Sequence, residues 1–299
     1  MNVSMMDSYN LAWKLVHSIH GLTPSTASGA PDPVLETFEL ERLDIARQLI
    51  DFDTKFSHMF SGKIGSDDSS KPGLTHDEFL RVFSEGSGFT SGCGLQYHPS
   101  SIVKPTGASS DAARGLADNL EHGYMTPGKR LLNVELKRYA DGSTRQIHDG
   151  KFSQISQDRT FSPHDLTFTR CKEMGSSGRY TLMVLGSNDL LDPCGSSQKA
   201  LQSSSEILDK FPAGVIDLVV LQPLTVRFEW TDLPRCVKQL AEMKIYGLAK
   251  QEDAYKIYGI AKEAGALVVV RPDGYVGMLG RLDAPGMVED YFKGCLGRK

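Results

Sequence analysis

The side chains that could carry out covalent chemistry in this chain lack partners at useful spacing. The five cysteines are widely separated: Cys93, Cys171, Cys194, Cys236 and Cys295. No two of them form a C-x-x-C pair, which argues against a disulfide framework, a structural zinc and a dithiol redox centre. Cys93 stands between two glycines, as in a catalytic loop, but a flexible interdomain hinge explains those glycines better. No G-x-S-x-G nucleophile elbow occurs.

Metal binding has one candidate pair. His17 and His20 are three residues apart in an expected helix, and two such imidazoles could chelate a metal ion. No carboxylate or cysteine nearby completes a ligand set, so two histidines on the polar face of the helix are the favoured interpretation. The other six histidines form no ligand pattern, and we predict no metal site.

Two glycine-containing motifs could bind an anion. Gly175-Ser-Ser-Gly178 has the composition of a phosphate nest, but no Lys-Ser or Lys-Thr pair follows it, which favours a surface turn. In Arg271-Pro-Asp-Gly274 the arginine could clamp an anionic ligand. Alternatively, residues 272–274 form a type I or type II turn, and Arg271 pairs with a nearby acid. The second interpretation is favoured.

The elements that would position these residues begin with a helix in the first turn of the chain. Its apolar residues fall at helical spacing and predict one wide buried face: Met5, Tyr9, Ala12, Val16 and Ile19, widened by Leu11 and Leu15. Asn2 and Ser4 can accept hydrogen bonds from the free N–H groups of the first turn. Gly21 is a suitable end. A second amphipathic helix is expected over residues 34–60.

The second half of the chain alternates between strands and helices. A hairpin is expected around Asp141-Gly142, with strands near 132–136 and 145–148. Further strands are expected at 180–185, 215–221, 266–270 and 275–279, and helices at 197–210, 253–264 and 284–296. This order is typical of a thioredoxin-like arrangement.

Composition excludes some classes of partner. The chain has 299 residues and a net charge of −4, so no basic field attracts nucleic acid or anionic lipid. The longest apolar run, residues 215–221, contains an aspartate and is too short to span a bilayer. The start of the chain has no signal-peptide pattern, and the cysteine usage fits a reducing, cytoplasmic compartment.

Several segments resemble the FAD-dependent aromatic hydroxylases of the phenol 2-monooxygenase type. They are Met1-Asn2 with Asp7 and Asn10-Leu-Ala-Trp-Lys-Leu15, then Phe38-Glu-Leu-Glu-Arg42, Gly88-Phe-Thr-Ser-Gly92, and Arg271-Pro-Asp-Gly-Tyr-Val276 with Tyr255 and Tyr258-Gly259 before it. The match is weakest at 104–121 and 153–178. The family's Gly-Asp motif and Gly-rich turn do not occur here, nor does G-x-G-x-x-G.

The resemblance implies an α+β chain. Residues 1–92 would be the C-terminal helices of an FAD- and substrate-binding domain. Residues 93–299 would be a dimerisation domain, with a thioredoxin-like α/β core at about 127–299 that lacks a C-x-x-C motif. In such a chain Leu11, Trp13 and Leu15 are expected to lie partly exposed or to be covered by a second copy, because the flavin domain's sheet would be missing.

The resemblance also implies a site and an activity. The first helix would aim its free N–H groups and positive dipole end at the flavin, so Met1 and Asn2 are the candidate cofactor-binding residues. The activity would be hydroxylation of a phenolic small molecule with FAD, NADPH and O2, in a homodimer formed through the C-terminal domain. The catalytic residues are not identifiable. The alternative is a truncated or stand-alone dimerisation scaffold that binds no flavin.

Overall fold

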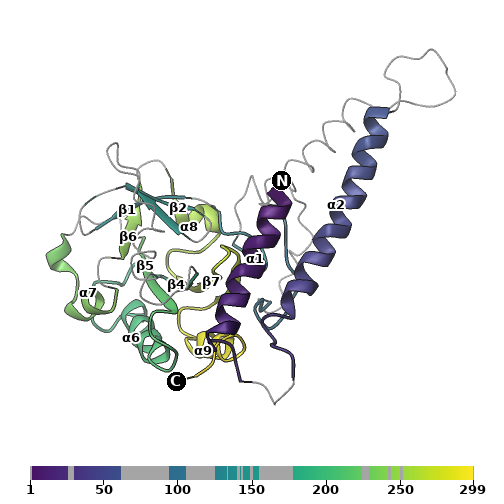
Figure 1. Ribbon diagram of the computed structural model, residues 1–299. Helices are drawn as coiled ribbons and strands as arrows, with labels where there is room; N and C mark the ends of the chain where they lie inside the picture. The colour runs from purple at the N-terminus through teal and green to yellow at the C-terminus, as the bar shows by residue number, and fades with distance from the viewer. Residues whose placement is uncertain are drawn as a thin grey trace, which may run out of the picture.

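The computed structural model describes most of the chain: residues 2–25, 30–61, 94–105, 125–132, 134–139, 142, 144–148, 151–154, 178–223, 229–241, 244–249 and 252–298. A mixed α/β body is flanked by two long helices, one of which extends well beyond the body (Figure 1). Within the described ranges, no helix combines the length and apolar character that a bilayer crossing requires.

The two long helices lie side by side. Helix α1 spans Asn2–Ile19 and α2 spans Thr37–Ser61. Gly21, with φ of 63°, follows the end of α1, because glycine tolerates the left-handed conformation that stops a helix. Before α2, the Asp32 carboxylate accepts hydrogen bonds from the backbone N–H groups of Val34 and Leu35. Both predicted helices are therefore confirmed.

Eight strands form one sheet in the order β3-β2-β1-β6-β5-β4-β7-β8. Their bounds are β1 Val134–Arg138, β2 Thr144–His148, β3 Lys151–Gln154, β4 Tyr180–Leu185, β5 Ile216–Leu221, β6 Ile245–Leu248, β7 Ala266–Val270 and β8 Val276–Gly280. The remaining helices are α6 Ser196–Leu208, η1 Trp230–Asp232, α7 Arg235–Ala241, α8 Ala254–Tyr258 and α9 Gly286–Lys293.

The C-terminal part of the sheet has the predicted topology. Strands β4 and β5 are parallel and joined through α6, whereas β7 runs antiparallel to β4 and pairs with β8 before α9. The strand order β5-β4-β7-β8 with these directions is a thioredoxin-like core. The predicted α+β class with a thioredoxin-like α/β domain is confirmed.

Residue alternation builds a core on each face of the sheet. Leu182 and Val184 of β4 pack with α6 and α9 on one face, and Met183 and Leu185 pack with α8 on the other. A strand buried on both faces reads as a continuous apolar run, which is why the sequence of β4 predicts its position well. Trp13 of α1 joins the core on the α6 and α9 side.

Some elements differ from the predictions. Helix α8 covers only Ala254–Tyr258 of the expected 253–264, because Gly259 adopts a left-handed conformation with φ of 71° and ends the helix. Strands β3 and β6 and helix α7 were not predicted. The segment at 88–92 that resembles the family lies outside the described residues.

Candidate functional site

The first turn of α1 contains no acidic side chain. The helix begins at Asn2, and Ser4 is exposed. The first N–H groups of a helix have no partner within the helix, so this end can donate hydrogen bonds to an anionic or electronegative group. Met1 and the side chain of Asn2 lie outside the described residues, and their proposed contact with a cofactor stays a prediction.

The inner face of α1 is polar, contrary to prediction. Asn10, Lys14 and His17 are buried together with Trp13, whereas Met5, Leu15 and Ile19 of the expected apolar face are exposed. The prediction that the apolar residues form the buried side of this helix is therefore wrong. The reason is a set of charged partners on α2 and on the turn between β7 and β8.

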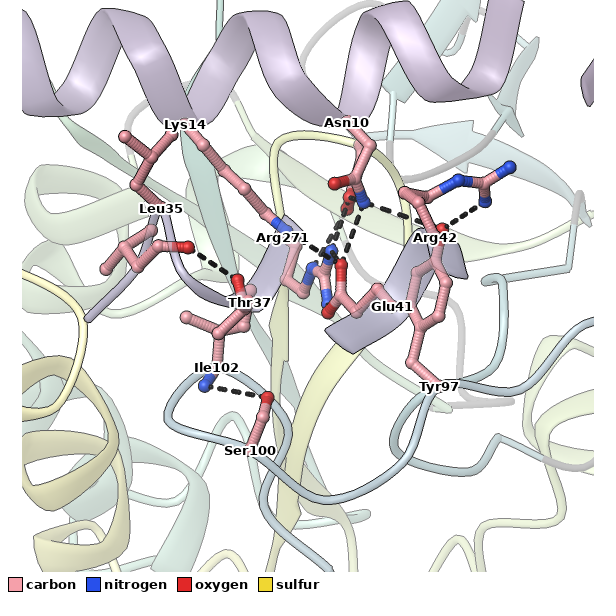
Figure 2. Close-up of polar contacts among 12 residues, drawn as sticks. Asn10, Lys14, Leu35, Thr37, Glu41, Arg42, Tyr97, Ser100, Ile102 and Arg271 are labelled. Atoms are coloured by element: carbon pink, nitrogen blue, oxygen red, sulfur yellow. Dashed lines mark hydrogen bonds and ion pairs between the residues drawn. The ribbon is translucent and has the colours of Figure 1, made fainter. Parts of the chain in front are cut away.

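These partners form a junction cluster, which consists of Asn10, Lys14, Glu41, Arg271 and Asp273. Figure 2 shows Asn10 and Lys14 pointing from α1 toward Glu41 and Arg271. Its two cations and two carboxylates balance in charge, and all five side chains are buried. A buried charge is tolerated only when it is paired and hydrogen-bonded, and this cluster meets both conditions.

Glu41 is the central acceptor of the junction cluster. Its Oε2 atom accepts hydrogen bonds from Asn10 Nδ2 at 2.8 Å, Lys14 Nζ at 2.8 Å and Arg271 Nη2 at 2.9 Å. Arg271 Nη1 donates to Oε1, which completes a bidentate pair. Burial alone would raise the pKa of Glu41, but Arg271 and Lys14 outweigh it and lower that pKa to about 2.

Lys14 and Arg271 respond differently to the same burial. Burial lowers the pKa of Lys14 to about 8, although the Glu41 carboxylate opposes the change. Burial also disfavours charge on Arg271, but Asp273 and Glu41 outweigh it and raise the Arg271 pKa. Arg271 Nε donates to Asp273 Oδ1 at 3.0 Å, and the Gly274 N–H closes the turn on the Arg271 carbonyl. The predicted turn with Arg271 paired to a nearby acid is confirmed.

Trp13 ties α1 to the sheet domain. Its Nε1 donates to Asp273 Oδ2 at 3.1 Å, and its ring contacts those of His17 and Tyr180 edge-on. Trp13 is 1% exposed, so its predicted partial exposure is wrong, whereas Leu15 is exposed as predicted. His17 is also buried, with Nε2 3.2 Å from the Gly178 carbonyl oxygen, which contradicts its placement on a polar surface.

Tyr97 lies next to the junction cluster and contacts Asn10 and Arg42. Arg42 Nη1 donates to the Tyr97 hydroxyl at 2.9 Å, and Arg42 Nε donates to the carboxylate of Asp7. Burial raises the pKa of Tyr97, and the charge of Asp273 acts in the same direction. The phenol therefore stays neutral, and Arg42 links α1 and α2 through Asp7.

The loop between β4 and α6 of this thioredoxin-like core has no C-x-x-C motif and instead contains a hydrogen-bonded carboxylate, that of Asp189. Asp189 accepts hydrogen bonds from the backbone N–H groups of Ser196 and Ser197 at the start of α6, and from the Ser187 hydroxyl at 2.6 Å. These hydrogen bonds outweigh burial and lower the pKa of Asp189. Cys194 is free and exposed. The N–H groups of Ser196 and Ser197 at the start of α6 already donate to Asp189, so they are not available to the Cys194 sulfur.

The other sequence candidates are not brought together. Cys93, Cys171 and most of the Gly175–Gly178 motif lie outside the described residues, and His20 is exposed. Among the described residues, no three histidine, cysteine or acidic side chains are placed to hold a metal ion. Sequence reasoning missed Lys14 and Glu41. The available signal was a lysine and a glutamate amid apolar residues on two adjacent helices.

Comparison with known proteins gives the chain a family context. Residues 168–299 match the model of the phenol hydroxylase C-terminal dimerisation domain. The flavin-dependent oxygenase ucdD of Aspergillus ustus is 30% identical over 95% of this chain and 39% of its own length. The phenol 2-monooxygenase fsqG of Aspergillus fumigatus is 28% identical over 98% of this chain and 44% of its own length.

A bacterial relative gives the same result. The 3-hydroxybenzoate 4-monooxygenase of Comamonas testosteroni is 28% identical over 98% of this chain and 43% of its own length. The chain thus spans about two fifths of the length of the curated relatives that it matches. Over nearly its whole length it resembles the C-terminal region of flavin-dependent aromatic monooxygenases, including their C-terminal dimerisation domain.

Proposed function

We propose that this chain forms the C-terminal portion of an FAD- and NADPH-dependent monooxygenase that uses O2 to hydroxylate a phenolic small molecule. The proposal rests on the alignment of 95–98% of this chain's length with flavin-dependent oxygenases and aromatic monooxygenases. Its parts are a helical segment at 1–92 from the flavin domain, a dimerisation domain at 93–299 that forms a homodimer, and a cytoplasmic location.

The residues present fit only one part of FAD. The N–H groups and positive dipole end at the start of α1 suit an electronegative edge of the cofactor, with Met1 and Asn2 as the proposed contact residues. The sequence has no G-x-G-x-x-G motif to hold the ADP half. The cofactor would supply the oxygen chemistry, and a flavin-binding part resembling the remainder of the relatives would hold most of it.

The chain's own residues hold helix α1 in a fixed position. The junction cluster fixes α1 against α2 and the turn between β7 and β8, and Trp13 anchors the same helix in the core. A helix held by buried ion pairs keeps its N-terminus in one place, which is what orientation of a cofactor requires.

The second candidate function is a dimerisation scaffold that binds no flavin. The match of residues 168–299 to a dimerisation domain, and the lack of a G-x-G-x-x-G motif in these 299 residues, favour it. Visible flavin absorbance of the purified chain distinguishes the two. A yellow protein that oxidises NADPH when a phenol is present supports the monooxygenase, and a colourless folded dimer supports the scaffold.

The contact between α1 and flavin has its own test. Ser4→Glu places a negative charge at the N-terminus of α1, where an acidic side chain stabilises the helix but repels a negatively charged ligand. We expect weaker binding in an FAD titration with no loss of thermal stability. Thr54→Glu, on an exposed position of α2, is the control. Equal FAD affinity in both variants would remove α1 from the binding site.

A further inference from the structure

The turn between β7 and β8 contains an Asp-Gly peptide bond, at Asp273-Gly274. In such a pair the backbone nitrogen of the glycine can attack the side-chain carboxyl carbon of the aspartate, because glycine has no Cβ atom to hinder the approach. A C–N bond forms, one water molecule leaves, and the product is a five-membered succinimide. Water then opens the ring at either carbonyl group, which gives aspartate or isoaspartate. The reaction needs no oxidant, metal or cofactor.

The carboxylate of Asp273 is fixed by four hydrogen bonds. Its Oδ1 atom accepts from Arg271 Nε at 3.0 Å. Its Oδ2 atom accepts from Trp13 Nε1 at 3.1 Å, from Asn10 Nδ2 at 3.2 Å and from Arg271 Nη2. Ring closure requires the carboxyl carbon to turn toward the Gly274 nitrogen and one carboxyl oxygen to depart as water. Both oxygens are hydrogen-bonded and the residue is only 6% exposed, so the folded protein opposes this step.

The attacking nitrogen is fixed as well. The Gly274 N–H group donates to the Arg271 carbonyl oxygen at 3.0 Å, and the Gly274 carbonyl oxygen accepts from the Leu131 N–H group at 3.0 Å. Rotation of the peptide group toward the carboxyl carbon would break these two hydrogen bonds. Formation of the succinimide therefore requires the turn to open first.

We propose that Asp273-Gly274 is a latent site of aspartate isomerisation, which the contacts from α1 keep closed. Two of the residues that donate to the carboxylate, Asn10 and Trp13, belong to α1. The other donor, Arg271, lies in the same turn as Asp273. Movement of α1 away from the turn would therefore free Oδ2 of two of its three hydrogen bonds. The inference concerns buried groups, and it does not depend on whether the chain binds flavin.

Isomerisation would make a reversible opening permanent. In isoaspartate the main chain runs through the former side chain, so the backbone of the turn gains one methylene group and the carboxylate side chain loses one. The carboxylate then cannot reach Asn10 and Trp13 from its former position, and the lengthened turn cannot form the same backbone hydrogen bonds. An isomerised chain would thus have lost the contact of α1 with this turn.

Isotope labelling of the purified chain tests the proposal. The protein is incubated in oxygen-18 water at physiological temperature and pH and is then digested with trypsin in ordinary water. Hydrolysis of the succinimide introduces an oxygen-18 atom. Trypsin does not cleave before Pro272, so Asp273 is the only aspartate in the peptide 263–281. The other two Asp-Gly pairs, Asp141-Gly142 and Asp149-Gly150, fall in different peptides and serve as references in the same sample.

The folded and unfolded chains should differ at Asp273. In guanidinium chloride the three Asp-Gly pairs should take up label at similar rates. In the folded parent chain, labelling at Asp273 should be at least about tenfold slower than in the unfolded chain, because only molecules with an opened turn react. Trp13→Phe keeps an aromatic ring but removes the Nε1 donor. It should accelerate labelling of Asp273 in the folded chain about fivefold, which is the effect of one hydrogen bond of typical strength.

Two control variants separate local opening from other effects. Trp230→Phe, at the chain's other tryptophan, should leave the rate at Asp273 unchanged. Leu201→Ala removes a buried side chain of α6, outside the junction cluster, and lowers the melting temperature by creating a cavity. It should accelerate labelling of Asp273 much less than Trp13→Phe does. The proposal fails if Leu201→Ala accelerates labelling equally, if Trp13→Phe has no effect, or if Asp273 is labelled equally fast in the folded and unfolded parent chain. Absence of label at Asp273 in the unfolded chain would also overturn it.

Discussion

Replacing Glu41 by glutamine tests the junction cluster most directly. The substitution keeps the shape of the side chain and removes its charge. Lys14 and Arg271 are both 0% exposed, and they would then share a single carboxylate, that of Asp273. Removing one partner of a buried ion pair costs about 3–5 kcal/mol, because an uncompensated charge stays buried.

The pKa of Glu41 gives an independent magnitude. The folded protein lowers this pKa from 4.5 to about 2. At about 1.4 kcal/mol per pH unit, this corresponds to roughly 3 kcal/mol of stability from ionised Glu41 near neutral pH. The cost of breaking a buried ion pair and the free energy from the pKa shift are therefore similar. A chain of this size should lose about 6–12 °C in melting temperature.

The sign of the pH dependence follows from the lowered pKa. A carboxyl group whose pKa is lower in the folded state stabilises the protein fully above its unfolded pKa of 4.5. This stabilisation is lost as the pH falls from 4.5 toward about 2. The stability difference between the parent chain and Glu41→Gln should therefore be largest near pH 7 and shrink below pH 4.5.

Urea unfolding at pH 7 and at pH 3.5 measures both quantities. The matched control is Glu39→Gln, because Glu39 lies exposed in the first turn of the same helix. It should change the free energy of unfolding by less than about 0.5 kcal/mol. A loss below about 1 kcal/mol for Glu41→Gln, or a difference that does not change with pH, would refute the described role of this carboxylate.

Three further predictions concern neighbouring contacts. The pKa of Lys14 falls from 10.5 to about 8 on folding, so the unfolded chain binds more protons between pH 8 and 10.5. The free energy of unfolding should therefore increase as the pH rises through that range. Lys14→Met should remove the contribution of this residue to the increase, as measured by urea unfolding at pH 7.5 and 10. Trp13→Ala should cost about 3–5 kcal/mol, because it removes a large buried ring, and thermal unfolding should show much less loss for Trp230→Ala, at the chain's other, half-buried tryptophan. Gly265→Ala should destabilise by more than about 1–2 kcal/mol, because φ is +62° and a Cβ atom would lie 2.4 Å from the Leu185 carbonyl oxygen; Gly286→Ala, where a Cβ meets no atom within 4 Å, is the control in the same melting assay.

The fold of the C-terminal part could be predicted well from the sequence. Strands such as β4 and β7 are continuous apolar runs bounded by turn residues, and both matched their expected residues. Strand β6 escaped detection because it is only four residues long and includes a glycine. Its position depends on hydrogen bonds to β1 and β5, which periodicity does not reveal.

The site was harder to predict because partners distant in sequence reversed the amphipathic pattern of α1. Hydrophobic periodicity assumes that apolar side chains face inward. In α1 the ion pair between Lys14 and Glu41, together with the Trp13 hydrogen bond to Asp273, determines which face is buried. The turn at Arg271 could be predicted because turn chemistry is local, whereas Glu41 as its partner lies 230 residues away.

The separation along the chain of the residues in the junction cluster has a consequence during synthesis. Asn10 binds Asp273, 263 residues later. At a translation rate of about 5–20 residues per second, α1 leaves the ribosome roughly 13–50 s before its partner on the turn between β7 and β8 exists. Throughout that time Lys14 can reach Glu41, which lies 27 residues later, but the helix lacks Asp273, Arg271 and the core around Trp13. The junction cluster can therefore close only after the turn between β7 and β8 has been made.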